Sequence, residues 1–191
     1  MADTADVGVI VLCGGTSRRM GGTDKTALPL GEHTVLDHLL DELPANWPVV
    51  CVGVERPTRR TVAWTREAPP GGGPVAGIAA GLEHVTTGIV AVLAGDQPFA
   101  GPAAGELVEQ LARHPKADAA TALDGEGRRQ PLLTAYRTLV LRRAVPEPAA
   151  DAPARHLLAA LTVLEVPQPD ERTHDVDTPE ALARARHRVE P

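Results

Sequence analysis

A glycine-rich segment near the start of the chain carries the residues best suited to chemistry. Residues 12–25 read LCGGTSRRMGGTDK and place Arg19 and Lys25 among four glycines, directly after the apolar run 7–12. Glycines let consecutive backbone N–H groups turn toward one anion, because no Cβ blocks the approach. The arginine and the lysine add cations for the oxygens of a triphosphate. The segment therefore predicts a phosphate-binding loop.

Two familiar phosphate loops are excluded by their spacing. No register of residues 14–26 supplies the Gly-x-x-x-x-Gly-Lys-Ser/Thr pattern of the P-loop. The dinucleotide fingerprint Gly-x-Gly-x-x-Gly is absent after the first apolar run, and a loose match at 71–76 is interrupted by Pro74. A redox domain that binds a dinucleotide is therefore disfavoured.

An acidic residue follows another apolar run. Asp96 stands directly after residues 88–95, within LAGDQPF (93–99). In open α/β sheets, ligands bind beyond the carboxyl ends of the strands. Mg²⁺ needs few carboxylate oxygens when phosphates and waters complete its coordination. The position predicts that Asp96 is a metal ligand, and the alternative is an aspartate that caps the turn containing Pro98.

These residues need a sheet to position them, and the apolar pattern supplies one. Short apolar runs predict strands, and apolar stripes with helical spacing predict helices between them. Strands are expected at 7–12, 49–54, 61–64, 88–95, 117–123, 130–137 and 161–167. Helices are expected at 34–43, with Thr34 as its N-cap, and at 73–85, 101–113, 154–161 and 178–188. The alternation predicts an α/β fold, a three-layer, mostly parallel Rossmann-like sheet with helices on both faces.

Length and composition narrow the classes of function. The 191 residues suit one domain, 1–191, and the net charge of −6 with two Trp, one Tyr and one Phe disfavours nucleic-acid binding. Cys13 and Cys51 are the only cysteines and form no zinc-binding spacing. The acidic start lacks the features of a signal peptide, and the apolar runs are too short to span a membrane. A cytoplasmic protein without membrane contact is expected.

The segment GGTSRRMGGTDK resembles the opening motif of the molybdenum cofactor guanylyltransferases, within the nucleotidyltransferase superfamily. Later segments resemble further blocks of that family in the same order, namely GPVAGIAAGL (73–82), LAGDQPF (93–99), QPLLTAYR (130–137) and DVDTPEAL (175–182). The resemblance implies a fold of the nucleotide-diphospho-sugar transferase type. It also implies Mg²⁺-dependent transfer of GMP from GTP to molybdopterin, a phosphorylated pterin, with release of pyrophosphate.

The resemblance also implies roles for individual residues. The backbone of Leu12, Cys13, Gly14, Gly15 and Thr16 is expected to cradle the nucleotide. Arg19 and Lys25 are expected to stabilise the phosphates, and Asp96 to hold the metal as a catalytic and nucleotide-binding residue. The family usually has asparagines at the positions of Asp175 and Asp177 in this chain. Metal ligation and capping of the last helix are balanced for Asp177, and capping is favoured for Asp175.

The base and the acceptor are less well defined. Gly53 and Glu67 match family positions that hold the guanosine, where an asparagine and an aspartate are usual. Glu55 is an alternative for the first position, and Glu67 is otherwise an exposed loop acid. CTP, another phosphorylated acceptor, or a non-catalytic nucleotide-binding module therefore remain alternatives. The candidates for pterin contact are residues of one block, which a buried edge strand explains equally well: Gln130, Pro131, Tyr136 and Arg137.

Overall fold

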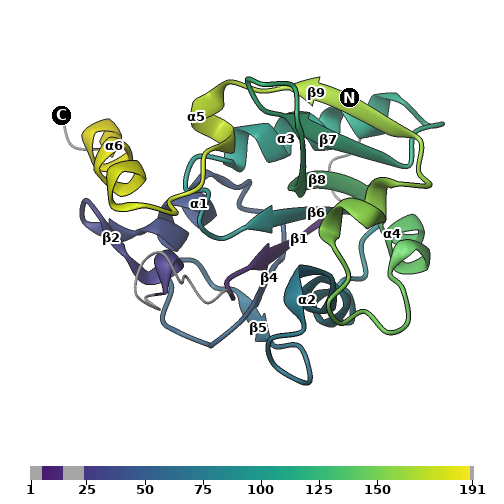
Figure 1. Cartoon of the computed structure of the whole chain (residues 1–191), viewed down its shortest axis with the longest axis horizontal. Coiled ribbons are helices and arrows are strands. Elements are labelled where there is room, and N and C mark those ends of the chain that lie inside the picture. Colours follow the sequence, from purple (N-terminus) through teal and green to yellow (C-terminus); the bar gives the residue numbers. More distant parts are fainter. Residues whose placement is uncertain (1–5, 15–23, 190–191) are drawn as a thin grey trace.

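A seven-stranded sheet forms the centre of the computed structural model, which describes residues 6–14 and 24–189. The strand order is β5-β4-β1-β6-β8-β7-β9 (Figure 1). The bounds of the strands are β1 (Val7–Leu12), β4 (Val49–Val52), β5 (Ala63–Thr65), β6 (Ile89–Ala94), β7 (Ala119–Leu123), β8 (Arg129–Arg137) and β9 (Val163–Pro167). All seven predicted strands are confirmed, and their ends differ from the predicted ones by at most two residues.

Most neighbouring strands run parallel. β1 pairs in parallel with β4 and β6, β4 pairs in parallel with β5, and β7 pairs in parallel with β9. β8 is the exception, because it runs antiparallel to both β6 and β7. The carboxyl ends of β1, β4, β5 and β6 therefore lie at one edge of the sheet. The alternative of an edge strand at 130–137 is wrong, since β8 lies inside the sheet.

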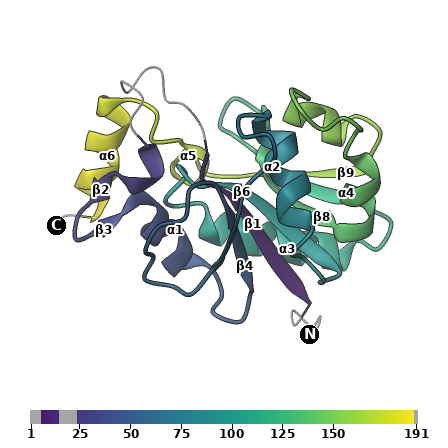
Figure 2. The same cartoon turned by 90° about the horizontal axis from the view of Figure 1, so that it is seen from below.

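Helices cover both faces of the sheet (Figure 2). Val9 and Val11 of β1 pack with α1 (Val35–Glu42) and α3 (Gly101–Arg113) on one face. Ile10, between these two valines, packs on the other face with α2 (Gly73–Leu82), α4 (Thr138–Ala144) and the 3-10 helix η3 (Ala154–Leu158). This alternation builds two apolar layers on one sheet and confirms the predicted three-layer arrangement.

Glycine brings α2 close to the sheet. A Cβ built on Gly81 would lie 2.8 Å from Cγ2 of Ile10, which is closer than side-chain carbons approach. The absence of a side chain at this position therefore sets how near α2 lies to β1. The apolar stripe of this helix, Val75, Ile78 and Leu82, is buried as its spacing predicts.

A third apolar cluster lies beyond the sheet. The hairpin β2 (Pro29–Leu30) and β3 (His33–Thr34) lies beside α6 (Pro179–Val189) in both views (Figures 1 and 2). Leu30 of the hairpin, Leu182 of α6, and Phe99 and Val176 belong to this cluster. The cluster thus joins the segments that follow Lys25 and Asp96 to the carboxyl-terminal part of the chain.

The predicted helices agree with the structure except in two places. Residues 101–113 form a helix with the expected bounds, and Thr34 caps α1 in a capping box with Asp37. The helix expected at 154–161 is confirmed only over residues 154–158, where η3 has bonds from residue i+3 to residue i and buries the adjacent Leu157 and Leu158. The pattern gave no expectation for α4 or for the short helix at Asp170–Thr173.

Two short helices complete the described elements, η2 (Lys25–Ala27) and α5 (Asp170–Thr173). Within residues 6–14 and 24–189, every helix is too short or too polar to cross a membrane.

Candidate active site

A cavity of about 620 Å³ opens at the carboxyl ends of β1, β4 and β6. Its lining includes the ends of these strands, the turn at Lys25 and the loop that leads into α2. Seven of the predicted site residues line it: Leu12, Cys13, Gly14, Lys25, Gly53, Glu67 and Asp96. Gly15, Thr16 and Arg19 lie outside the described residues. The sheet edge therefore gathers most of the predicted site in one cavity, as parallel strands require.

Lys25 and Asp96 face each other in this cavity. Lys25 Nζ lies 3.6 Å from Asp96 Oδ2, and both side chains are about four-fifths buried, with exposed fractions of 20% and 23%. Asp96 follows the turn after β6, where Gly95 N–H donates to the Leu12 carbonyl at 2.9 Å. This hydrogen bond fixes the approach of Asp96 to the end of β1. A cation and a carboxylate therefore lie together where the phosphate loop is expected.

The Lys25 side chain is presented by η2. Asp24 caps this short helix, because its Oδ1 accepts hydrogen bonds from Thr26 N at 3.0 Å and from Thr26 Oγ1 at 2.7 Å. Asp24 itself lines the cavity. The aspartate immediately before the lysine thus orders the turn that carries it.

Burial shifts the pKa of the acidic side chains. Burial raises the pKa of Asp96, the ammonium of Lys25 lowers it, and the Asp177 carboxylate raises it. Burial also raises the pKa of Asp175 to about 6, and the negative charge of Asp96 adds to this rise. Asp96, Asp175 and Asp177 therefore act on one another electrostatically. A cation between them would relieve this repulsion.

The donor set fits Mg²⁺ bound together with a substrate. Among residues 6–14 and 24–189, no group of three or more His, Cys, Asp or Glu side chains is arranged to hold a metal ion alone. Mg²⁺ usually takes one or two carboxylates and completes its shell with phosphate oxygens and waters. Asp96 is one such carboxylate in the cavity, and the Asp177 carboxylate lies near enough to act on its charge.

Hydrogen bonds join the segment 173–177 to the end of β6. Val176 N–H donates to the Asp96 carbonyl at 2.8 Å. The side-chain amide of Gln97 is buried and donates to the Thr173 carbonyl at 3.0 Å and to Asp175 Oδ1 at 2.7 Å. These hydrogen bonds therefore fix the position of Asp175 relative to Asp96.

Thr178 caps the last helix. Its Oγ1 accepts a hydrogen bond from Ala181 N at 3.1 Å, and its carbonyl accepts from Leu182 N at 3.0 Å. The cap predicted for Asp175 is therefore wrong, since the hydroxyl of Thr178, three residues closer to the helix, caps it instead. Asp175 faces Gln97 instead.

The two positions expected near the base differ in kind. Gly53 has a φ of +154°, and a Cβ on it would lie 3.1 Å from the carbonyl carbon and oxygen of Cys13. Glu67 is half-buried, and its Oε1 accepts a hydrogen bond from Gly71 N at 2.9 Å. Glu55 is exposed and does not belong to the described lining of the cavity. The structure thus places Gly53 and Glu67, rather than Glu55, beside the cavity.

The Cys13 thiol is unsuited to nucleophilic chemistry. The neighbouring Cys51 side chain and burial raise its pKa, so the thiol stays protonated at neutral pH. Its hydrogen donates to the Val11 carbonyl at 3.6 Å. What Cys13 offers to a ligand is therefore its backbone.

The pterin candidates separate into two groups. Tyr136 is fully buried, and Arg137 donates to the carbonyls of Ala117 at 2.8 Å and Leu111 at 3.3 Å, so both have structural roles. Gln130 lines a second cavity of about 270 Å³, together with Asp175 and Asp177. Within residues 130–137, Gln130 is thus the pterin candidate that lies near Asp175 and Asp177.

Several polar residues at the site were not predicted from the sequence, among them Asp24, Gln97 and Arg56. Asp24 and Gln97 each stand next to a predicted residue, and adjacency was the signal that could have found them. Arg56 reaches the site from the loop after β4, where it bonds Asp24 and the Cys13 carbonyl. Its contact with Asp24 joins residues 32 positions apart, and local spacing contains no signal for such a contact.

Comparison with known proteins agrees with this site. The family described as "MobA-like NTP transferase domain" matches residues 9–166. A molybdenum cofactor guanylyltransferase of Mesorhizobium japonicum is 37% identical over 146 residues, which cover 70% of this chain and 68% of that protein. A probable molybdenum cofactor guanylyltransferase of Natronomonas pharaonis is 30% identical over 198 residues, covering 94% of this chain and 96% of that protein.

Solved structures share the fold. Molybdopterin-guanine dinucleotide biosynthesis protein A of Archaeoglobus fulgidus matches with a TM-score of 0.68 and 24% identity, over 95% of this chain and 97% of that one. The 2-C-methyl-D-erythritol 4-phosphate cytidylyltransferase of Thermus thermophilus matches with a TM-score of 0.72 and 19% identity, over 95% and 98%. The fold is thus of the expected nucleotide-diphospho-sugar transferase type. From the match over residues 9–166 and from these relatives, it follows that the chain belongs to the MobA-like NTP transferases, the family of the molybdenum cofactor guanylyltransferases.

Proposed function

We propose that this nucleotidyltransferase joins GMP from GTP to molybdopterin and releases pyrophosphate. A phosphate oxygen of the acceptor attacks the α-phosphorus of GTP. The bond from that phosphorus to the bridging oxygen of the β-phosphate breaks, and the electron pair leaves with pyrophosphate. The names of the relatives support the substrates, and the cavity at the sheet edge supports nucleotide binding.

The Lys25–Asp96 pair is the observation that carries the proposal. Negative charge moves from the α-phosphate toward the departing pyrophosphate during transfer. A cation already fixed beside that path lowers the barrier, and a single preorganised donor of this kind is worth roughly 10²–10³ in rate. Lys25 is fixed in this way by its turn and by Asp96 at 3.6 Å. Arg19, which lies outside the described residues, is proposed as a second cation.

We propose Mg²⁺ as the cofactor, held by Asp96 and Asp177. When bound, the ion would neutralise part of the charge on the phosphates. Asp96 is close to the positive charge of Lys25 and to the negative charge of Asp177. Asp96 would therefore hold the ion at the end of the cavity where Lys25 lies, and Asp177, which lines the second cavity, would approach it from that side.

The backbone of residues 12–16 would cradle the nucleotide, with the base near β4 and the loop before α2. Glu67 is the proposed base contact, because one of its carboxylate oxygens is held by Gly71 and the carboxylate lines the cavity. A carboxylate matches the neighbouring N–H donors of guanine. Gly53 leaves room for the Cys13 backbone and supplies no side chain to the base.

The acceptor needs little activation. A phosphate group is already ionised at neutral pH, so the reaction requires no strong general base. This agrees with the raised pKa of the Cys13 thiol, which leaves that group neutral. We expect residues 1–191 to act as one domain and the reaction to take place in the cytoplasm.

The test combines the protein, Mg²⁺ and molybdopterin with each of the four nucleoside triphosphates in turn, and follows pyrophosphate. The proposal predicts release with GTP that depends on the acceptor. Release with CTP but not with GTP would contradict the guanylyl assignment. Binding of nucleotides without release from any of them would instead indicate a binding module.

A further inference from the structure

Arg56 joins the two halves of the nucleotide cradle. Its Nη1 donates to Asp24 Oδ2, and its Nη2 donates to the Cys13 carbonyl at 3.4 Å. The guanidinium also lies over the ring of Trp64, 5.5 Å from the ring centroid. Its side chain is 16% exposed. One buried cation therefore connects the end of β1 with the residue that begins the Lys25 turn.

Both partners of Arg56 line the cavity. Cys13 contributes backbone at the end of β1, and Asp24 uses its other oxygen to cap η2 through Thr26. The Asp24 carboxylate thus lies between Arg56 and the turn that presents Lys25. A movement of Asp24 would move this turn, and with it the ammonium that lies 3.6 Å from Asp96.

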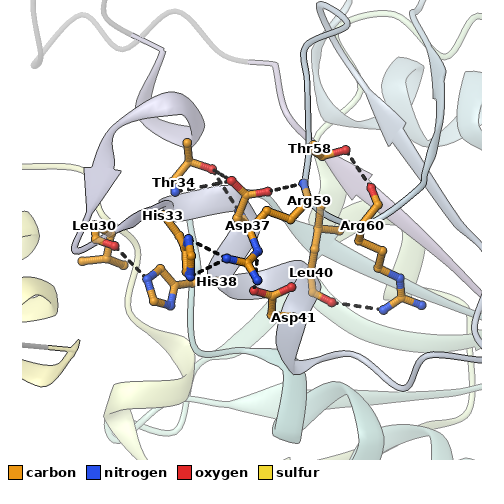
Figure 3. Close-up of polar contacts among 10 residues, drawn as sticks. All are labelled: Leu30, His33, Thr34, Asp37, His38, Leu40, Asp41, Thr58, Arg59 and Arg60. Carbon is orange, nitrogen blue, oxygen red and sulfur yellow. Dashed lines mark hydrogen bonds and ion pairs between the residues drawn. The ribbon is translucent and has the colours of Figure 1, made fainter.

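The segment that carries Arg56 is anchored to α1 (Figure 3). The backbone N–H of Arg59 donates to Asp37 Oδ1 at 2.9 Å, and its guanidinium contacts His33 and Asp41. Arg60 donates to the carbonyls at the end of α1, those of Leu40 and Leu43, both at 3.0 Å. These contacts hold residues 59 and 60 against the region of α1, a few residues along the chain from Arg56.

The guanidinium is directed toward protein groups and not toward the cavity. Arg56 is absent from the residues of the described chain that line the cavity. Its Nε is buried and finds no hydrogen-bond partner among the described residues, which is costly for a charged donor. Arg56 is therefore poorly explained as a contribution to stability alone.

We propose that Arg56 is a positioning residue for triphosphate binding. By holding Asp24 and the Cys13 carbonyl, it fixes the Lys25 turn against the end of β1, and the ammonium is then aligned before GTP arrives. The inference rests on the proposed function, because it assumes that Lys25 meets the triphosphate. Arg56 would thus affect nucleotide binding through the position of the Lys25 ammonium.

The test is a double-mutant cycle on the dissociation constant for Mg²⁺–GTP, measured by calorimetry without acceptor so that no turnover occurs. Arg56→Met should weaken binding by about tenfold when Lys25 is present, the size expected for one charge-assisted hydrogen bond. In a Lys25→Met background the same change should weaken binding by about twofold or less, because the two residues act as a unit. A residue with a purely structural role would cost the same in both backgrounds.

Two further variants separate the outcomes. Asp24→Asn removes the carboxylate charge that pairs with Arg56 and should reproduce the tenfold loss, which keeps the test valid if Arg56→Met fails to fold. Arg113→Met removes an arginine from an exposed pair on α3 and should leave GTP binding unchanged. Equal losses with and without Lys25, for either Arg56→Met or Asp24→Asn, would overturn the inference while leaving the proposed function intact. Failure of the unchanged protein to bind any nucleoside triphosphate would overturn both.

Discussion

Gln97 Nε2 donates a hydrogen bond to Asp175 Oδ1 at 2.7 Å, and the amide and the carboxylate meet beside Asp96. The bond favours the charged form of Asp175, but burial and the charge of Asp96 outweigh it and raise the pKa of Asp175 to about 6. Folding therefore places a carboxylate where ionisation is unfavourable.

Replacement of this carboxyl should stabilise the protein in one pH range. The folded pKa of Asp175 lies above its ordinary value of 3.8, so the folded state binds more protons between these values and stability falls as pH rises through them. Asp175 is exposed, so solvent screens part of this effect, and Asp175→Asn should raise the free energy of unfolding at pH 8 by on the order of 1 kcal/mol. Denaturant unfolding at several pH values, with a chelator present, measures the difference. A gain that stays the same at pH 4 would show that ionisation is not its cause.

Asp96 should be required for turnover and not for folding. Asp96→Ala is expected to lower pyrophosphate release by at least about 100-fold, because it removes the proposed metal ligand and the partner of Lys25. Burial raises the pKa of Asp96, so losing its charge should leave the melting temperature unchanged or higher. Retained activity in a folded variant would remove Asp96 from the mechanism.

Gly53 should tolerate no side chain. Gly53→Ala would strain a backbone with φ +154° and press a Cβ to within 3.1 Å of the Cys13 carbonyl, at a cost of about 1–3 kcal/mol. Because Cys13 belongs to the cradle, GTP binding should weaken as well. The matched control is Gly105→Ala in α3. A Cβ there would meet nothing within 4 Å, and the substitution should stabilise the helix slightly. Equal effects of the two changes would argue against the close contact at Gly53.

Glu67 should contribute to GTP affinity more than to catalysis. Glu67→Gln is expected to raise KM for GTP by about tenfold with kcat nearly unchanged, because a base contact is the same in the ground state and the transition state. Glu55→Gln is the control, since Glu55 is exposed and lies outside the described lining of the cavity. If the Glu55 variant shows the loss and the Glu67 variant does not, the base contact is assigned to the wrong residue.

Local patterns predicted most of the fold. The α3 stripe and the Thr34 cap depend on neighbouring residues, and both were predicted correctly. The direction of β8 depends on which strands it joins, and its apolar pattern is the same in either direction. The 3-10 form of η3 depends on burying two adjacent leucines, which a helical stripe does not distinguish.

The same holds for the site, where residues set by local patterns could be predicted and contacts between distant segments could not. Lys25 and Asp96 could be predicted because each follows an apolar strand in a recognisable segment, and strand topology brings their side chains together. The role of Thr178 as helix cap was hidden by two nearby aspartates that are equally good caps. The contact between Arg56 and Asp24 joins residues 32 positions apart, which no local pattern encodes.

The most direct test of the central claim follows the phosphorus atoms of GTP. The protein would be incubated with Mg²⁺, molybdopterin and GTP that is labelled either at the α-phosphate or at the γ-phosphate. Guanylyl transfer predicts that the α-label enters a pterin-containing product, while the γ-label leaves as pyrophosphate. Appearance of the γ-label on the acceptor, or as inorganic phosphate with no labelled pterin product, would contradict the account.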